Sequence, residues 1–152
     1  MIAEAGLTFA ALFAGHSFGD HWIQTGHQAV CKGGPGWPGR RACLGHVVTL
    51  QATKFLLVMM AVGLVGLRLS PWWLLAALVI DGASHYWADR RFTLEALANR
   101  LQFIGKGDFY SQGVDLVNHE GNHAPHLGTG RYALDQSWHH LWLFVAALVA
   151  VQ

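Results

Sequence analysis

An apolar segment between residues 71 and 89 carries three ionisable side chains, Asp81, His85 and Asp89, at every fourth position. On an α-helix, residues four apart lie on one face, one turn above another. An ionisable side chain is costly to bury in lipid, so this stripe should face protein or water. The segment therefore predicts a membrane-spanning helix with a candidate functional site on its protein-facing side.

The composition extends this expectation to the whole chain of 152 residues. Hydrophobic residues make up 53% and charged residues only 12%, whereas soluble domains carry about 25% charged residues. We therefore expect a single polytopic membrane domain over residues 1–152. The net charge of +1 gives no indication of nucleic-acid binding. The N-terminus lacks the positive region of a signal peptide, so the first segment should remain as an anchor.

Four segments have lengths near the roughly 20 residues that a spanning helix needs. They cover about residues 2–24, 44–67, 71–89 and 132–151, and a polar insert fills 90–131. The predicted fold class is all-α: a bundle of four transmembrane helices with a cytoplasmic insert of helix and loop. Because the turn at 68–70 is short, the second and third helices should form an antiparallel hairpin. Residues 25–43 are rich in Gly and Pro and predict a turn-rich loop.

Positively charged residues indicate the orientation of these helices. Most Lys and Arg residues lie in the two long loops, and Arg68 alone lies in the turn on the other side. Cytoplasmic loops carry the excess of positive charge in membrane proteins. We therefore expect both long loops in the cytoplasm and both termini outside.

Acids and histidines fall at matching depths in all four predicted spans. With alternating helix directions, seven of them lie in the cytoplasmic half of the membrane: His16, Asp20, His46, Asp81, His85, Asp135 and His139. Facing helices of a bundle commonly assemble metal sites in this way. Imidazole and carboxylate suit Zn, Mn or Fe, and so many candidates allow one or two ions, with Zn favoured. Hydrogen bonds between helices, or a proton path, would explain the same residues without a metal.

Further polar residues in the spans are expected to support these ligands. His46 could serve as a ligand or as a catalytic base. Four more residues should act next to the ligands: Gln24, Lys54, Asp89 and Gln136. Of these, Lys54 would offset the charge of Asp81 or of another acid.

The first loop offers a second metal site, built from His27, Cys31, Cys43 and His46. Two thiols and two imidazoles at these spacings resemble a structural zinc site. The alternatives are a disulfide or unlinked thiols, and unlinked thiols are favoured because cytoplasmic thiols stay reduced.

The insert contains a helical pattern at 92–103, followed by a loop rich in Gly and His. His119, Glu120 and His123 match the His-Glu-x2-His pattern of zinc proteases, but Gly121 and the nearby Pro argue against the helix that this motif requires. Glu120 could still act as a general base and His123 could contact substrate. The alternative is a solvated polar loop.

A Gly-rich turn precedes the fourth span and ends in Arg131. Free amides at the start of that helix, together with the guanidinium, would favour an anionic group such as a substrate phosphate. A plain helix cap is the simpler explanation of the same residues.

The order of these motifs resembles a known family. It runs His16-x3-Asp20 with a following Gln24, then His46, then Asp81-x3-His85, then Asp135-Gln136-x2-His139. This order is similar to that of the bacterial membrane proteins grouped as domain of unknown function 3307. The resemblance implies a small helical protein of the bacterial inner membrane. A looser likeness to inner-membrane metal-dependent hydrolases supports hydrolysis by analogy.

Together these patterns predict an intramembrane metal-dependent hydrolase that works near the cytoplasmic interface. Its substrate would be a phosphoester, a lipid or another small molecule, its surroundings the lipid bilayer, and its assembly a monomer or a homo-oligomer. The alternative is a metal-ion or proton carrier, or a metal-stabilised scaffold without turnover. The outward halves of the helices consist mainly of Ala, Leu and Val, and this favours an enzyme open to one side.

Overall fold

The computed structural model describes residues 2–113 and 127–152, and within these ranges the chain is helical and contains no strand. Four long helices form its body: α1 (Ile2–Phe18), α3 (Gly36–Val65), α4 (Pro71–Asp89) and α8 (Gly130–Ala150). The all-α prediction is therefore confirmed. The α4 bounds match the predicted third span, and α8 begins two residues before the predicted fourth.

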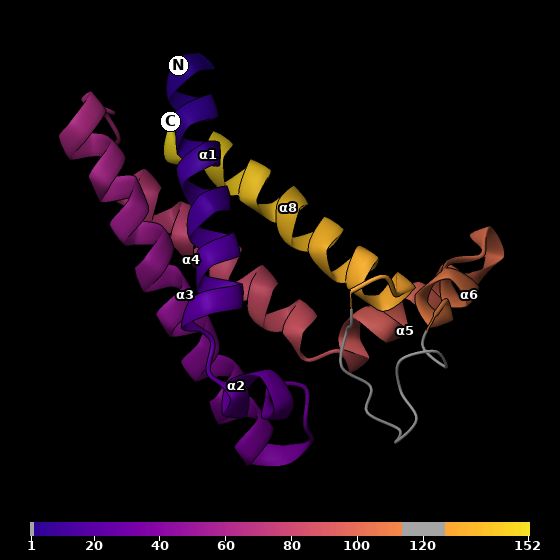
Figure 1. Ribbon diagram of the computed structural model, residues 1–152. Coiled ribbons are helices and arrows are strands. Elements are labelled where there is room, and N and C mark those ends of the chain that lie inside the picture. The colour runs from indigo at the N-terminus through magenta and orange to yellow at the C-terminus, as the bar shows by residue number, and fades with distance from the viewer. Residues whose placement is uncertain (1, 114–126) are drawn as a thin grey trace.

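The long helices pack in neighbouring pairs, α1 on α3 and α4 on α8, with further contacts between α1 and α8 and between α3 and α4. Both termini lie at the same end as the turn between α3 and α4, and the short helices lie at the opposite end (Figure 1). That turn begins at Gly66, whose φ of 72° is left-handed and suits glycine. The expected antiparallel hairpin is thus present.

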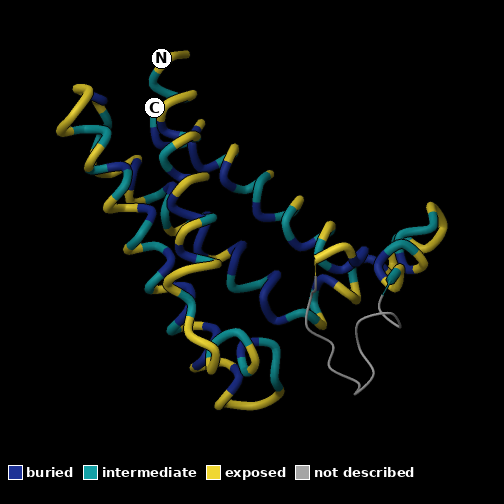
Figure 2. The backbone as a smooth tube through the Cα atoms, viewed as in Figure 1, coloured by how far each residue is buried: buried dark blue, intermediate teal, exposed yellow. Residues whose placement is uncertain are grey.

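The end that holds the termini has an apolar core. Its buried residues come from α1, α3, α4, α8 and the turn between α3 and α4: Leu12, Val58, Leu67, Leu74, Ala77, Leu143, Ala146, Ala147 and Ala150. The four alanines make room for close helix packing. Figure 2 shows such buried positions recurring along the inner sides of the long helices.

Two glycines bring α1 against α3. A Cβ atom on Gly15 would lie 2.8 Å from Lys54 Cα, and one on Gly19 would collide with the Leu50 side chain. Gly15 and Gly19 are four residues apart, and small residues at this spacing let two helices of a membrane protein pack closely against each other. A single π-helical turn, η1 (Gly19–Ile23), then continues α1.

The prediction of a loop over residues 25–43 is wrong for most of its length. A short helix, α2 (Gly26–Cys31), starts there with a capping box between Thr25 and Gln28. The long helix α3 then begins at Gly36, after Pro35 at its N-cap. Pro38 is tolerated in the first turn, where the missing N–H would have no partner within the helix.

The described part of the insert forms three short elements: α5 (Phe92–Arg100), η2 (Gln102–Ile104) and α6 (Lys106–Ser111). The helical pattern predicted over 92–103 is therefore confirmed. A small second core joins them to α8 and consists of Leu94, Ala98 and Tyr110, with Trp87, Leu134 and Trp138 packed against it. The backbone N–H of Gly130 donates to Gln112 O at 3.0 Å, so the two ends of the segment 113–129 are tied together.

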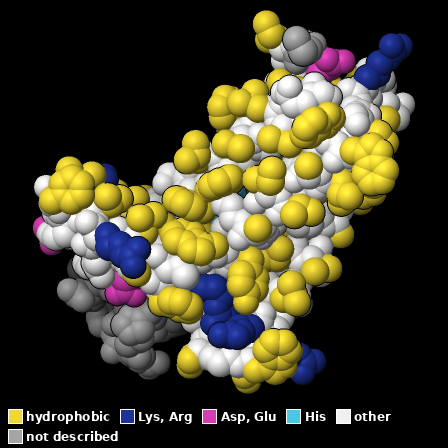
Figure 3. Space-filling view, turned by 180° about the vertical axis from the view of Figure 1, so that it is seen from behind, with side chains coloured by type: hydrophobic (Ala, Val, Ile, Leu, Met, Phe, Trp, Pro, Cys, Tyr) yellow, Lys and Arg dark blue, Asp and Glu magenta, His cyan; other side chains and the backbone are white. Residues whose placement is uncertain are grey.

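Large apolar side chains cover the outside of the long helices. Figure 3 views the molecule from behind and shows hydrophobic side chains over most of its body. Phe55, Leu56 and Met60 of α3 are about half exposed, as are Leu141 and Phe144 of α8. Among the described residues, one helix is long and apolar enough to cross a membrane, Gly36–Val65, so the prediction of a four-span bundle is not supported.

Candidate metal centre

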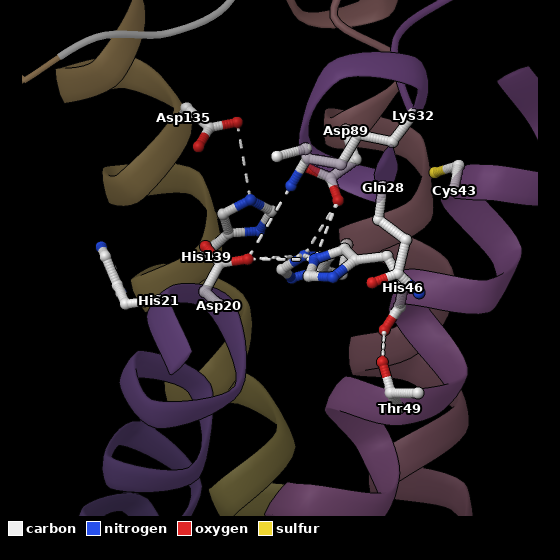
Figure 4. Close-up of polar contacts among 12 residues, drawn as sticks. Asp20, His21, Gln28, Lys32, Cys43, His46, Thr49, Asp89, Asp135 and His139 are labelled. Atoms are coloured by element: carbon white, nitrogen blue, oxygen red, sulfur yellow. Dashed lines mark hydrogen bonds and ion pairs between the residues drawn. The ribbon is translucent and has the colours of Figure 1, made fainter. Parts of the chain in front are cut away.

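Four ligand atoms meet at the end of the bundle away from the termini (Figure 4). Asp20 comes from the π-helical turn η1, His46 from α3, and His85 and Asp89 from the last two turns of α4. The two histidines and Asp89 are at most 3% exposed. Three packed elements, η1, α3 and α4, therefore position the four side chains.

Asp20, His46 and His85 form one group with metal-ligand spacing, and Asp89 lies close to both imidazoles. His46 Nε2 lies 3.0 Å from Asp20 Oδ1, 3.3 Å from Asp89 Oδ2 and 3.1 Å from His85 Nε2. His85 Nε2 lies 3.1 Å from Asp89 Oδ2 and 4.0 Å from Asp20 Oδ1. A tetrahedron with metal–ligand bonds of about 2.0–2.1 Å has edges of about 3.3 Å.

Hydrogen bonds satisfy these four atoms poorly. Asp20 Oδ1 and Asp89 Oδ2 are buried and accept no well-aligned hydrogen bond from the described residues. Each Nε2 can carry one proton at most, so one N–H of His46 cannot serve three neighbours at once. A divalent cation bound by the two imidazoles and a carboxylate would satisfy these ligand atoms. The Nδ1 atoms of His46 and His85 also have no partner in the described part of the chain, whereas metal-binding histidines usually donate this second N–H.

Lys32, at the C-terminal end of α2, is the residue at the centre that sequence reasoning missed. Its ammonium lies 2.9 Å from Asp89 Oδ1 and 3.8 Å from Asp20 Oδ1. Burial disfavours the charged ammonium, but the two carboxylates outweigh burial and raise the pKa of Lys32. Two carboxylates thus share one cation, and a net negative charge remains for a metal.

Arginines at the start of the insert hold this lysine in place. Arg90 donates to Lys32 O at 2.9 Å and to Gly34 O at 2.5 Å, and Arg91 donates to Ala29 O at 2.7 Å. The α2 segment is therefore clamped to the end of α4. The only sequence signal for Lys32 was its positive charge in a loop beside the predicted site.

His139 of α8 extends the cluster. Its ring stacks on that of His85 with centroids 3.9 Å apart, and His85, Asp89 and His139 form a second group with metal-ligand spacing. His139 Nε2 lies 3.5 Å from Asp135 Oδ1, and Gln136 donates to Asp135 Oδ2 at 3.2 Å. Asp135 therefore lies next to His139 but belongs to neither group.

His16 lies beside the cluster without joining either ligand group. It is fully buried, and neither ring nitrogen has a partner among the described residues. Its ring centroid lies 5.4 Å from that of His85 and 5.2 Å from that of His139. The predicted ligand is therefore a neighbour of the metal-ligand atoms.

Asp81 differs most from its predicted place. Its Oδ2 accepts hydrogen bonds from Lys54 Nζ and Gln51 Nε2, both at 2.6 Å. The structure thus pairs Asp81 with Lys54, as charge compensation suggested, and places Asp89 among the ligand atoms instead. The stripe on α4 is divided between an ion pair and the candidate metal centre.

The remaining predicted residues lie apart from these ligand atoms. Gln24 Nε2 is buried without a partner in the described ranges. The Arg131 guanidinium lies 5.1 Å from the Tyr110 ring centroid, and Thr129 caps α8 by accepting from Tyr132 N. This supports the plain-cap explanation for the Gly-rich turn. Glu120 and His123 fall outside the described residues.

The structure does not assemble the alternative zinc site of the first loop. Cys31 Sγ lies 3.7 Å from His27 Nδ1, whereas Cys43 Sγ faces Tyr86 O at 3.7 Å. Both thiols are free in the structure. His46 belongs to the cluster with Asp20.

Comparisons of the chain with family models, curated proteins and solved structures find no match. The resemblance to domain of unknown function 3307 therefore stays a prediction. What the centre can do is argued below from its own residues.

Proposed function

We propose that this chain is an integral membrane protein that binds a divalent transition metal through Asp20, His46, His85 and Asp89. One observation carries the proposal: the two imidazole nitrogens lie 3.0–4.0 Å from each other and from one oxygen of each carboxylate, and those two oxygens accept no aligned hydrogen bond from the described residues. Nitrogen and oxygen donors at this spacing suit Zn best, and Mn or Fe would also fit.

The distribution of polar and apolar side chains supports the membrane assignment. Charged residues such as Lys54 and Asp81 are buried, while Phe55, Leu56 and Phe144 are exposed. Of the other long helices, α1 has 17 residues, and α4 and α8 carry Asp and His residues that lower their mean hydropathy. Four spans with loops in the cytoplasm of a bacterium and termini outside remain our proposal for its placement in the inner membrane.

Hydrolysis is the reaction we assign to the centre. A bound divalent metal would lower the pKa of a water ligand and polarise the scissile group. His139 is placed to move a proton beside the cluster, because it stacks on His85 and is oriented by Asp135. The Asp20 side chain is 10% exposed, at the end of the bundle that we propose to face the cytoplasm. A phosphoester or lipid at that interface is the proposed substrate.

A structural metal without turnover is the second candidate. Protein atoms supply four ligands, and closed four-ligand sites are usually structural. The separation of 4.0 Å between His85 Nε2 and Asp20 Oδ1 is the widest measured edge of the cluster. A catalytic site would open there.

Two matched variants of acidic residues on the same face of α4 test the metal proposal. We expect the detergent-purified protein to hold about one equivalent of Zn by elemental analysis. Asp89→Asn should remove it, because the amide replaces a charged ligand. Asp81→Asn should retain it, since that carboxylate faces Lys54. Full metal content in Asp89→Asn, or none in the folded wild-type protein after reconstitution, would exclude this centre.

A substitution at His139 separates enzyme from scaffold. His139→Gln should lower hydrolysis of phosphoester or lipid substrates by at least about 100-fold, since it removes a general acid or base. Bound metal should stay near the wild-type amount. Metal-dependent stability without hydrolysis of any substrate would favour the structural metal.

A further inference from the structure

An apolar groove lies between α5, the start of α6 and α8, at the end of the bundle that carries the metal centre. Its volume is about 230 Å³. Its walls are formed mainly by leucines, Leu94 and Leu97 from α5, Leu101 directly after α5, and Leu134 and Leu141 from α8. The apolar walls exclude a polar ligand from most of its length.

A single charge marks one end of the groove. Of the described residues that line it, Lys106 alone carries a charge. On the neighbouring η2 turn, Phe103 and Ile104 are 82% and 59% exposed. Apolar side chains and a lysine side by side are typical of the boundary between lipid chains and head groups.

The inner wall of the groove connects to the metal centre through one side chain. Trp138 lines the groove, and its Nε1 donates to Ser84 Oγ at 2.9 Å. Ser84 directly precedes His85 in α4, and His139 directly follows Trp138 in α8. The groove and the cluster are therefore joined through neighbouring residues of two helices, α4 and α8.

We propose that this groove binds one acyl chain of an anionic phospholipid from the bilayer, with the head group beside Lys106. The groove is smaller than the roughly 300–1,000 Å³ typical of pockets for whole small molecules, so it suits one chain and leaves the head group outside. The inference rests on the proposed function. It identifies a phospholipid as the substrate class of the metal centre.

Photo-crosslinking in phosphatidylcholine nanodiscs tests this assignment. The probe is phosphatidylglycerol with a photoreactive group in its acyl chain, and labelled peptides are identified by mass spectrometry. We expect crosslinks to concentrate on α5 and α8. Leu97→Trp fills the groove and should reduce them about tenfold. Leu75→Trp, on the exposed face of α4, is the matched control and should leave them unchanged.

Removing the charge of Lys106 tests its proposed contact with the lipid head group. Lys106→Gln should reduce labelling by phosphatidylglycerol about fivefold, and labelling by a phosphatidylcholine probe much less. Labelling spread evenly over the lipid-facing helices, or unchanged in Leu97→Trp, would overturn the inference. Metal content measured in the same samples keeps the two proposals apart. A loaded metal centre with even labelling refutes the lipid site alone, whereas groove labelling in a protein that binds no metal refutes the metal centre alone.

Discussion

The two halves of the bundle are built by the same four helices but hold opposite kinds of side chain. Towards the termini, Leu12, Val58 and Leu143 are completely buried in an apolar core. Towards the other end, His46 and His85 are equally buried but surround two carboxylates. Burial of apolar side chains stabilises a fold, whereas buried ionisable groups are costly unless paired or bound to a metal. The polar half is therefore best explained by function and the apolar half by stability.

The boundary between the halves bears on the choice between enzyme and carrier. The ion pair of Lys54 with Asp81 is the last buried charge before the apolar core. Beyond it, the buried side chains of the described residues are apolar except for Thr8. An ion path through the bundle would need polar groups there, so the arrangement favours a centre reached from one side.

Breaking the boundary ion pair should give the largest loss of stability. Lys54→Met leaves Asp81 buried without its cation, and we expect the free energy of unfolding to fall by about 3–5 kcal/mol. Denaturant titration in detergent measures this loss. The double variant Lys54→Met with Asp81→Leu should regain most of it, since an apolar pair needs no charge compensation. A double variant as unstable as the single one would contradict a simple ion pair.

A substitution one turn from His139 sharpens the contrast between the halves. Leu143→Ala removes a fully buried side chain from the apolar core, and should lower the free energy of unfolding by about 2–4 kcal/mol through the cavity that it leaves. Its metal content should remain that of the wild type. Loss of metal in Leu143→Ala, measured at a temperature where it is folded, would show that the halves are not independent.

The close contact of α1 with α3 should give the smallest effect. Gly15→Leu places a side chain against Lys54 and should cost about 1–3 kcal/mol through overpacking. Gly6→Leu is the control on the same helix, since nothing lies within 4 Å of the added Cβ. Thermal unfolding in detergent compares the two. Equal unfolding temperatures for the two variants would show that the close contact between α1 and α3 does not contribute to stability.

Much of the helical framework followed from periodicity. The apolar run from 71 to 89 is bounded by Pro71 at its first turn, and α4 has those limits. The gathering of Asp20, His46 and His85 followed from matching depth in alternating helices. Gly15 and Gly19 also had a readable signal, the small-residue spacing, although the contact they make depends on the partner helix.

Other features depended on tertiary partners. Helix phase puts Asp81, His85 and Asp89 on one face, but which acid pairs with Lys54 depends on the offset between α3 and α4. The π-helical turn at Gly19–Ile23 leaves no mark in apolar periodicity. Lys32 reaches the cluster only because α2 folds back under the arginine clamp, and nothing local to that lysine indicates this.

The hydrogen bond from Gly130 N to Gln112 O has a consequence for how this protein could vary. It fastens the start of α8 to the end of α6, so the position of α8 does not depend on the path taken by the chain between them. Each doubling in length of a closed loop costs only about 0.6 kcal/mol. Residues added beside Gly113 or Gly128 should therefore cost little stability, while His139 keeps its place against His85.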